Sequence, residues 1–356
     1  MEGLVMDVSF FKGKKVLVTG HTGFKGAWLC ELLLSLGADV TGYALLPTGE
    51  ESLFSLLHLR ERMTSYYADI RDRSELSRVF SSVQPELVLH LAAQPIVSEG
   101  YRDPVYTYET NVMGTVYLLD CIRQADCVRS CLNVTTDKVY ANQEWEWSYR
   151  ENDVLDGFDP YANSKSCSEL VTHSYCRSYF ADRSLPVSTA RAGNVIGGGD
   201  FALNRILPDC VRAALEQREI LVRNPASIRP YQHVLEPLYA YLMIVQAQYE
   251  EAALAGAYNV GPGREDCVTT GELVSYFCEC WGQGQSWRVR ETNGPHEAGI
   301  LRLDSTRLEA AVGWKRTWGI HTAVDKTVEW TKAYQKGRDM SHVTQRQIEE
   351  FLGDKS

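Results

Sequence analysis

Short apolar runs alternate along the chain with segments whose apolar residues recur at helical spacing. The first run, 15–19, leads through a glycine-rich loop into an apolar helical pattern over 28–36, which ends at Gly37. Further runs typical of buried strands occupy 39–44, 64–69, 87–91, 130–134 and 186–190, and amphipathic helices are predicted over 71–83, 105–125 and 163–180.

This alternation predicts an α/β fold, a Rossmann-type doubly wound parallel sheet with helices on both faces. The rhythm breaks after residue 190, where three consecutive glycines at 197–199 and scattered prolines indicate loops and short helices. We therefore expect a smaller mixed α/β substrate-binding domain on the C-terminal side. The expected division is 1–190 for the cofactor domain with a return segment near 231–260, 191–340 mainly for the substrate domain, and 341–356 for a terminal helix or tail.

Charge and composition exclude several classes of function. The 356 residues include 36 Lys and Arg against 46 Asp and Glu, a net charge of −10, which argues against nucleic-acid binding through a general basic field. No apolar stretch reaches the roughly 18 residues of a membrane span, and the N-terminus lacks signal-peptide architecture, so we expect a cytoplasmic protein with no membrane partner. The ten cysteines are scattered without a Cys-x-x-Cys pair, which favours reduced thiols and no metal site.

The loop after the first run has the spacing of a phosphate-binding turn. Gly20 permits a tight turn, Gly23 lets backbone approach a pyrophosphate, and Gly26 permits close packing of the following helix on the sheet. The helix N-terminus then presents free N–H groups and a positive dipole end to the anion. Because a strand precedes the loop and a helix follows it, we expect it to bind a dinucleotide. The candidate cofactor residues are Gly20, His21, Thr22, Gly23, Phe24, Lys25 and Gly26.

The second strand leaves the choice between NAD and NADP open. An acidic residue after this strand is the usual contact to the ribose 2′-hydroxyl, and an arginine there accommodates a 2′-phosphate. The segment 43–46 has neither. Asp69, after the third strand, is either a contact to the adenine end or an aspartate that caps its own loop.

Tyr161 and Lys165 lie four residues apart, so a helix places both on one face. A tyrosine with its ordinary pKa near 10 is a poor base at neutral pH. A neighbouring ammonium and an oxidised nicotinamide both favour the phenolate, so we expect the pKa of Tyr161 to be lowered. Upstream, after the fifth strand, Thr136 is placed to bond a substrate hydroxyl that is being oxidised.

These motifs together resemble the extended short-chain dehydrogenases/reductases that modify nucleotide sugars, and the resemblance covers nearly the whole chain. Within that group the chain is most similar to the CDP-glucose 4,6-dehydratases. In dTDP-glucose dehydratases the catalytic pair is Asp-Glu, whereas here it is Asp137-Lys138. The segments that carry the resemblance are 20–26, 91–94, 135–138, the Tyr161 and Lys165 pair, 191–200 and 229–234.

The resemblance implies an internal redox cycle on bound NAD. Oxidation at the sugar C4, with Tyr161 as base, acidifies the C5 proton. Water then leaves across C5 and C6 with Asp137 as acid, and hydride returns to C6 to give CDP-4-keto-6-deoxyglucose. Lys138 is either a neutral C5 base or an electrostatic clamp on the enolate, and Lys165 also holds the nicotinamide ribose. The further cofactor contacts implied are Asp69, Ile70, Leu91, Ala92 and Ala93.

On the substrate side, the resemblance directs Asn194 and Arg229 to the sugar-nucleotide diphosphate and Gln94 to the sugar. The nucleotide base is not readable from the residues, so a dTDP-glucose or GDP-mannose 4,6-dehydratase remains an alternative, as does a 4-epimerase. Epimerases do not need an acid for the C6 oxygen, so Asp137 favours dehydration. A non-catalytic NAD(P)-sensing regulator commonly lacks the tyrosine or lysine that are both present here. The resemblance also implies a homodimer or homotetramer, with the helices predicted over 105–125 and 163–180 at its interface.

Overall fold

A computed structural model of the chain describes residues 6–47, 51–290 and 299–355. Within them, seven strands form one parallel sheet in the order β10-β6-β5-β4-β1-β2-β3. The order reverses between β1 and β4, and ligands bind at such a switch point beyond the carboxyl ends of the strands. The strands are β1 (Lys15–Thr19), β2 (Asp39–Ala44), β3 (Thr64–Tyr67), β4 (Leu87–His90), β5 (Ser130–Val134), β6 (Val187–Ala192) and β10 (Ala257–Val260).

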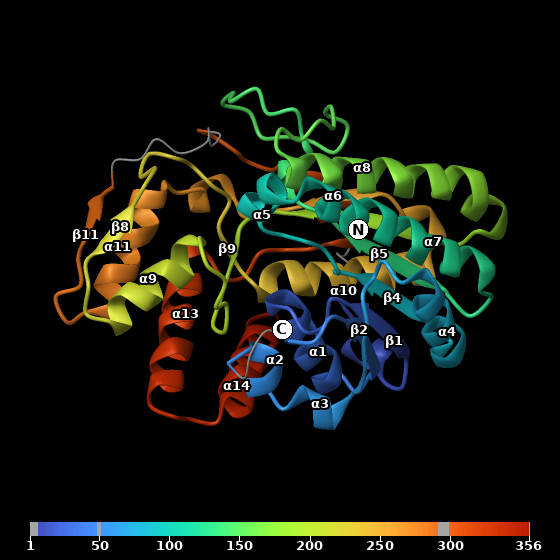
Figure 1. Cartoon of the computed structure of the whole chain (residues 1–356), viewed down its shortest axis with the longest axis horizontal. Coiled ribbons are helices and arrows are strands. Elements are labelled where there is room, and N and C mark those ends of the chain that lie inside the picture. Colours follow the sequence, from blue (N-terminus) through green and yellow to red (C-terminus); the bar gives the residue numbers. More distant parts are fainter. Residues whose placement is uncertain (1–5, 48–50, 291–298, 356) are drawn as a thin grey trace.

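Alternate residues of each strand are buried against the helical layers on opposite faces of the sheet, which confirms the doubly wound sheet. In β1, Val16 and Val18 pack with the layer of α1 and α10, while Leu17 packs with that of α4, α7 and α8. Both faces are therefore covered by helices (Figure 1). The helices in and around these layers are α1 (Phe24–Ser35), α2 (Leu53–Leu56), α3 (Leu59–Arg62), α4 (Arg73–Val83), α5 (Val97–Arg102), α6 (Pro104–Tyr108), α7 (Gly114–Gln124), α8 (Pro160–Tyr175), α10 (Leu235–Glu250), α12 (Thr306–Val312) and α14 (Met340–Asp354).

Two helices differ from the sequence expectation in ways that affect the site. The helix expected over 105–125 is interrupted by a π-helical turn, Glu109–Met113, between α6 and α7. The helix expected over 163–180 begins at Pro160, because the Asp159 side chain accepts from the N–H of Ala162 and proline suits the first helical position. Tyr161 therefore stands in the first turn of α8.

The later part of the chain builds a second, smaller core beside the sheet. There α9 (Ile206–Leu215), α11 (Thr270–Trp281) and α13 (Ile320–Gln335) bury Leu207, Phe277 and Val324 together. Two short parallel pairs flank them, β7 (Val195–Ile196) with β9 (Gln232–His233) and β8 (Ile220–Val222) with β11 (Trp287–Val289). Between these parts the chain returns to the large sheet through α10 and β10, and α14 packs against α1. No helix among the described residues is long and apolar enough to cross a membrane.

Candidate active site

The glycine-rich loop is held so tightly that side chains are excluded at two of its positions. Gly20 has a φ of +77°, and a Cβ there would lie 2.7 Å from the backbone nitrogen of Ala92. A Cβ on Gly26 would lie 2.1 Å from the carbonyl oxygen of Gly20. The loop therefore lies directly against the 91–93 segment that follows β4, which brings together the two predicted cofactor segments.

The N-terminus of α1 suits an anion. Gly23 is the N-cap and supplies no side-chain hydrogen bond, and the first turn contains Lys25 but no acidic residue. Burial lowers the pKa of Lys25 to about 7, and the charges of Arg205 and Lys165 add to this effect. Free N–H groups and a crowded set of cations at one helix end fit the pyrophosphate of a dinucleotide.

The side chains of three predicted cofactor residues make structural contacts within the protein. The ring of His21 is fully buried against Gly42 of β2, so only its backbone is available to a ligand. The carboxylate of Asp69 accepts from the backbone N–H and the guanidinium of Arg71, which is the loop-capping alternative. Ile70 is buried and meets Gly114 at the start of α7.

The segment after β5 gathers the predicted acid and its partners. The Asp137 side chain is buried, and its Oδ1 accepts from the Thr136 hydroxyl at 2.9 Å and from Lys138 Nζ at 3.2 Å. Its Oδ2 is buried and has no hydrogen-bond partner in the part of the chain that the structure describes. A buried polar atom without a partner costs free energy, so this oxygen is directed to a ligand group.

Tyr161 and Lys165 lie on one face of α8, as their spacing predicts. Burial raises the pKa of Tyr161 to about 12, while a hydrogen bond between its side chain and that of Thr136 opposes the rise. The expected lowering is therefore wrong for the protein's own groups, because Lys165 Nζ donates to the Val134 carbonyl at 2.9 Å and desolvation outweighs the nearby charges. Burial also lowers the pKa of Lys165 to about 8.

The predicted substrate residues are only partly brought together. Lys138 Nζ donates to Asn194 Oδ1 at 3.1 Å, which joins Asn194 to the segment 136–138. Arg229 lies in the loop before β9 and donates to the Ile228 carbonyl at 2.9 Å. Gln94 is buried, with its amide donating to Thr107 and its side-chain oxygen accepting from the N–H of Ile96. The Gln94 side chain therefore serves the loop rather than an open ligand surface.

Sequence reasoning missed three residues near this site. Arg205 pairs with Asp200 at 3.0 Å, and its charge acts on both Lys25 and Tyr161. Tyr241 of α10 is fully buried near Tyr161, and its hydroxyl has no partner among the described residues. Glu169 stands one helical turn beyond Lys165 on α8. Only for Glu169 did the sequence carry a signal, its spacing of eight from Tyr161 on the same helix face.

Comparisons with known proteins identify the family of this chain. A family model described as GDP-mannose 4,6 dehydratase matches residues 17–327. The CDP-glucose 4,6-dehydratase of Salmonella typhimurium is 42% identical, over 98% of this chain and 99% of its own. A dTDP-glucose 4,6-dehydratase from Streptomyces venezuelae, solved with NAD, is 25% identical with a TM-score of 0.78 and covers 92% of this chain and 99% of its own. A Thermus thermophilus UDP-glucose 4-epimerase in complex with NAD is 26% identical with a TM-score of 0.77, over 89% of this chain and 98% of its own. The resemblance inferred from the motifs is thereby confirmed, and the chain belongs to the GDP-mannose 4,6-dehydratase family.

Proposed function

We propose that this chain is an NAD-dependent CDP-glucose 4,6-dehydratase. Dehydration is supported chiefly by Asp137, a buried carboxyl group whose Oδ2 is unpaired within the described residues. It lies beside Thr136, which also interacts with Tyr161. An acid at this place serves the elimination of a hydroxyl, which an epimerase does not perform. The match to the Salmonella CDP-glucose enzyme over nearly the whole chain supports the choice of nucleotide sugar.

The residues of the chain divide the proton transfers among them. Bound NAD would supply the hydride acceptor for C4 and the hydride donor for C6, and its oxidised nicotinamide would favour the Tyr161 phenolate. Tyr161 accepts the proton of the C4 hydroxyl, which the Thr136 hydroxyl helps to orient. Asp137 donates a proton through Oδ2 to the C6 hydroxyl, which leaves as water. Gly20 and Gly26, with the α1 N-terminus, hold the dinucleotide, and Lys165 holds its nicotinamide ribose.

We propose the clamp role for Lys138. Its amino group donates to Asp137 Oδ1 at 3.2 Å and to Asn194 Oδ1 at 3.1 Å, which fixes it beside the predicted acid. A protonated lysine stabilises the negative charge that develops on the enolate oxygen. The C5 proton passes to a water molecule in the site, and solvent later returns a proton to C5. It also fixes Asn194 relative to the acid, so the sugar and the diphosphate are positioned by one network.

We propose that the second core, mainly within 191–340 and apart from the return segment 231–260, forms the substrate domain. There Asn194 and Arg229 serve the diphosphate. The test is turnover of CDP-glucose, dTDP-glucose, GDP-glucose and GDP-mannose, followed by mass spectrometry. We expect loss of one water from CDP-glucose with clear preference over the others. Preference for another nucleotide refutes the choice of substrate, and a product of unchanged mass refutes dehydration in favour of epimerisation.

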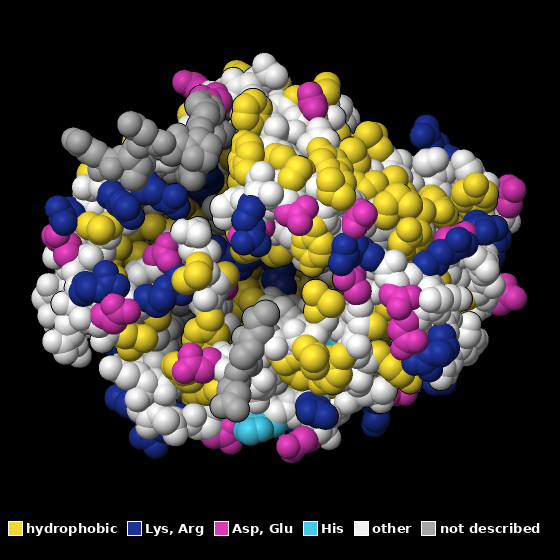
Figure 2. Space-filling model, viewed as in Figure 1, with side chains coloured by type: hydrophobic (Ala, Val, Ile, Leu, Met, Phe, Trp, Pro, Cys, Tyr) yellow, Lys and Arg dark blue, Asp and Glu magenta, His cyan; other side chains and the backbone are white. Residues whose placement is uncertain are grey.

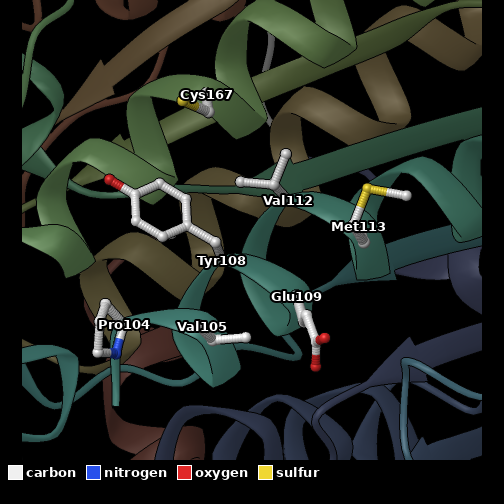
Figure 3. A pocket seen from close by; sticks show the side chains of 7 residues that line it. All are labelled: Pro104, Val105, Tyr108, Glu109, Val112, Met113 and Cys167. Atoms are coloured by element: carbon white, nitrogen blue, oxygen red, sulfur yellow. The ribbon is translucent and has the colours of Figure 1, made fainter. Parts of the chain in front are cut away.

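We further propose that α6, α7 and α8 form the interface of a homodimer or a larger homo-oligomer. Hydrophobic side chains gather over these helices (Figure 2), and Val105 and Met113 are 66% and 39% exposed. An apolar pocket opens on this face (Figure 3), lined by Pro104, Val105, Tyr108, Glu109, Val112, Met113 and Cys167. Exposed apolar surface of this kind favours association. Sedimentation of the Val105→Arg variant is expected to show monomers. The matched control Val289→Arg, on distant β11, is expected to retain the oligomer. A monomeric wild-type protein contradicts the proposal.

A further inference from the structure

Glu169 is a fully buried carboxylate behind the catalytic residues. It lies on α8 one turn beyond Lys165 and two turns beyond Tyr161, on the same helix face. Its two oxygens accept three hydrogen bonds. Thr135 Oγ1 donates to Oε1 at 2.5 Å, while Thr189 Oγ1 and Arg191 Nη2 donate to Oε2 at 2.7 and 2.9 Å. A carboxylate with this many donors remains charged in spite of its burial.

Through Arg191, the same network reaches the far end of the catalytic segment. Arg191 is also fully buried, and its Nη1 donates to the Tyr140 hydroxyl and to the Glu151 carbonyl, both at 2.9 Å. The Tyr140 hydroxyl in turn donates to Asn259 Oδ1 of β10 at 2.5 Å. Thr135 and Tyr140 stand immediately on either side of the segment 136–139. The buried pair therefore anchors both ends of the segment that carries Thr136, Asp137 and Lys138.

Glu169 also sets the electrostatic surroundings of Lys165. Its negative charge raises the pKa of Lys165 against the lowering by burial. The other titratable groups that act with Lys165 are Lys25 of α1, a repelling cation, and His90 of β4, whose pKa burial lowers to about 3 so that it stays neutral. Glu169 is thus the anion that favours the ammonium form of Lys165.

We propose that Glu169, paired with Arg191, is a positioning residue that fixes the Thr136–Asp137–Lys138 segment and holds a negative charge one helical turn from Lys165. This inference rests on the proposed dehydratase function and adds a residue to its site. A purely structural ion pair would affect stability alone. A positioning pair affects turnover and its pH dependence as well, because a displacement of about 1 Å at a reacting group can cost on the order of 100-fold in rate.

Two threonines provide a matched test. Thr135→Val and Thr189→Val each remove one hydroxyl that donates to Glu169, at buried sites, with the same change of side chain. Only Thr135 adjoins the catalytic segment, whereas Thr189 lies within β6. We expect both holoenzyme variants to lose similar thermal stability, with kcat lowered about tenfold in Thr135→Val and retained within about twofold in Thr189→Val. Equal losses of kcat in the two variants, or none in either, overturn the proposal.

The charge is tested with Glu169→Gln. Without the anion Lys165 loses its proton at lower pH, so the alkaline limb of the kcat/KM profile is expected to shift downward by about one unit. Glu31→Gln is the control, because Glu31 is buried and paired with Arg62 on another part of the chain; its profile should not move. An unmoved profile in folded Glu169→Gln refutes the charge role. If that variant does not fold, the threonine pair still decides the positioning role. A wild-type enzyme inactive on CDP-glucose would refute the proposed function instead, and the threonine comparison is then run on the nucleotide sugar that it does convert.

Discussion

Replacing Asp137 by asparagine separates the elimination from the oxidation that precedes it. Asparagine has nearly the same shape, and its oxygen can still accept from Thr136 and Lys138 at the place of Oδ1. Lys138 is 31% exposed and keeps its bond to Asn194, so the loss of the opposing charge is tolerated. What disappears is the carboxyl group that would pass a proton to the leaving hydroxyl. Positioned proton transfer is worth about 10²–10⁴-fold, or about 3–6 kcal/mol of barrier at roughly 1.4 kcal/mol per tenfold.

The assay is a single turnover of Asp137→Asn with CDP-glucose. We expect oxidation at C4 to stay within about tenfold of wild type, so that reduced nicotinamide absorbance builds up while the dehydrated product is delayed. Thermal unfolding checks that the fold is retained. Dehydration at a nearly wild-type rate would refute the acid role of Asp137. An equal loss in both steps would instead assign Asp137 to the placement of Thr136 and Tyr161.

Three further experiments test other parts of the site and fold. Lys138→Ala is expected to slow the incorporation of solvent deuterium at C5, and unchanged incorporation would count against the clamp. Gly26→Ala should lose bound NAD and thermal stability, because its Cβ would lie 2.1 Å from a backbone carbonyl oxygen, whereas Gly353→Ala, with nothing within 4 Å, should retain both. Burial lowers the pKa of His21 from 6.5 to about 4 and that of His90 to about 3. The unfolded chain therefore binds protons that the folded chain excludes, and stability that is full above pH 6.5 falls as the pH drops toward 4, by up to about 3 kcal/mol for each histidine. Measuring Tm across this range checks the sign, and a Tm that stays constant or rises contradicts it.

Local sequence determined the layers of this protein and the local geometry of its candidate site residues. The strand at 15–19 and the glycines that follow it have constraints that act within a few residues, because a tight turn and close helix packing exclude side chains. The pairing of Tyr161 with Lys165 is likewise a property of helical spacing. These features were predicted correctly because their physical causes lie within short stretches of the chain. The start of α8 was placed too late because the Asp159 cap, also a local feature, was not recognised.

Only the tertiary structure decided how these groups behave. The sign of the Tyr161 pKa shift depends on how much solvent the fold removes, and that quantity comes from elements distant in sequence. Lys138 meets Asn194, and Gln94 turns into its own loop, through contacts that no spacing predicts. The buried ion pair of Glu169 and Arg191 joins α8 to β6, because the fold packs this helix over the parallel strands of the sheet. Burial and the meeting of distant charges are properties of three-dimensional packing, so the chain alone indicates the residue types, and the fold sets their chemistry.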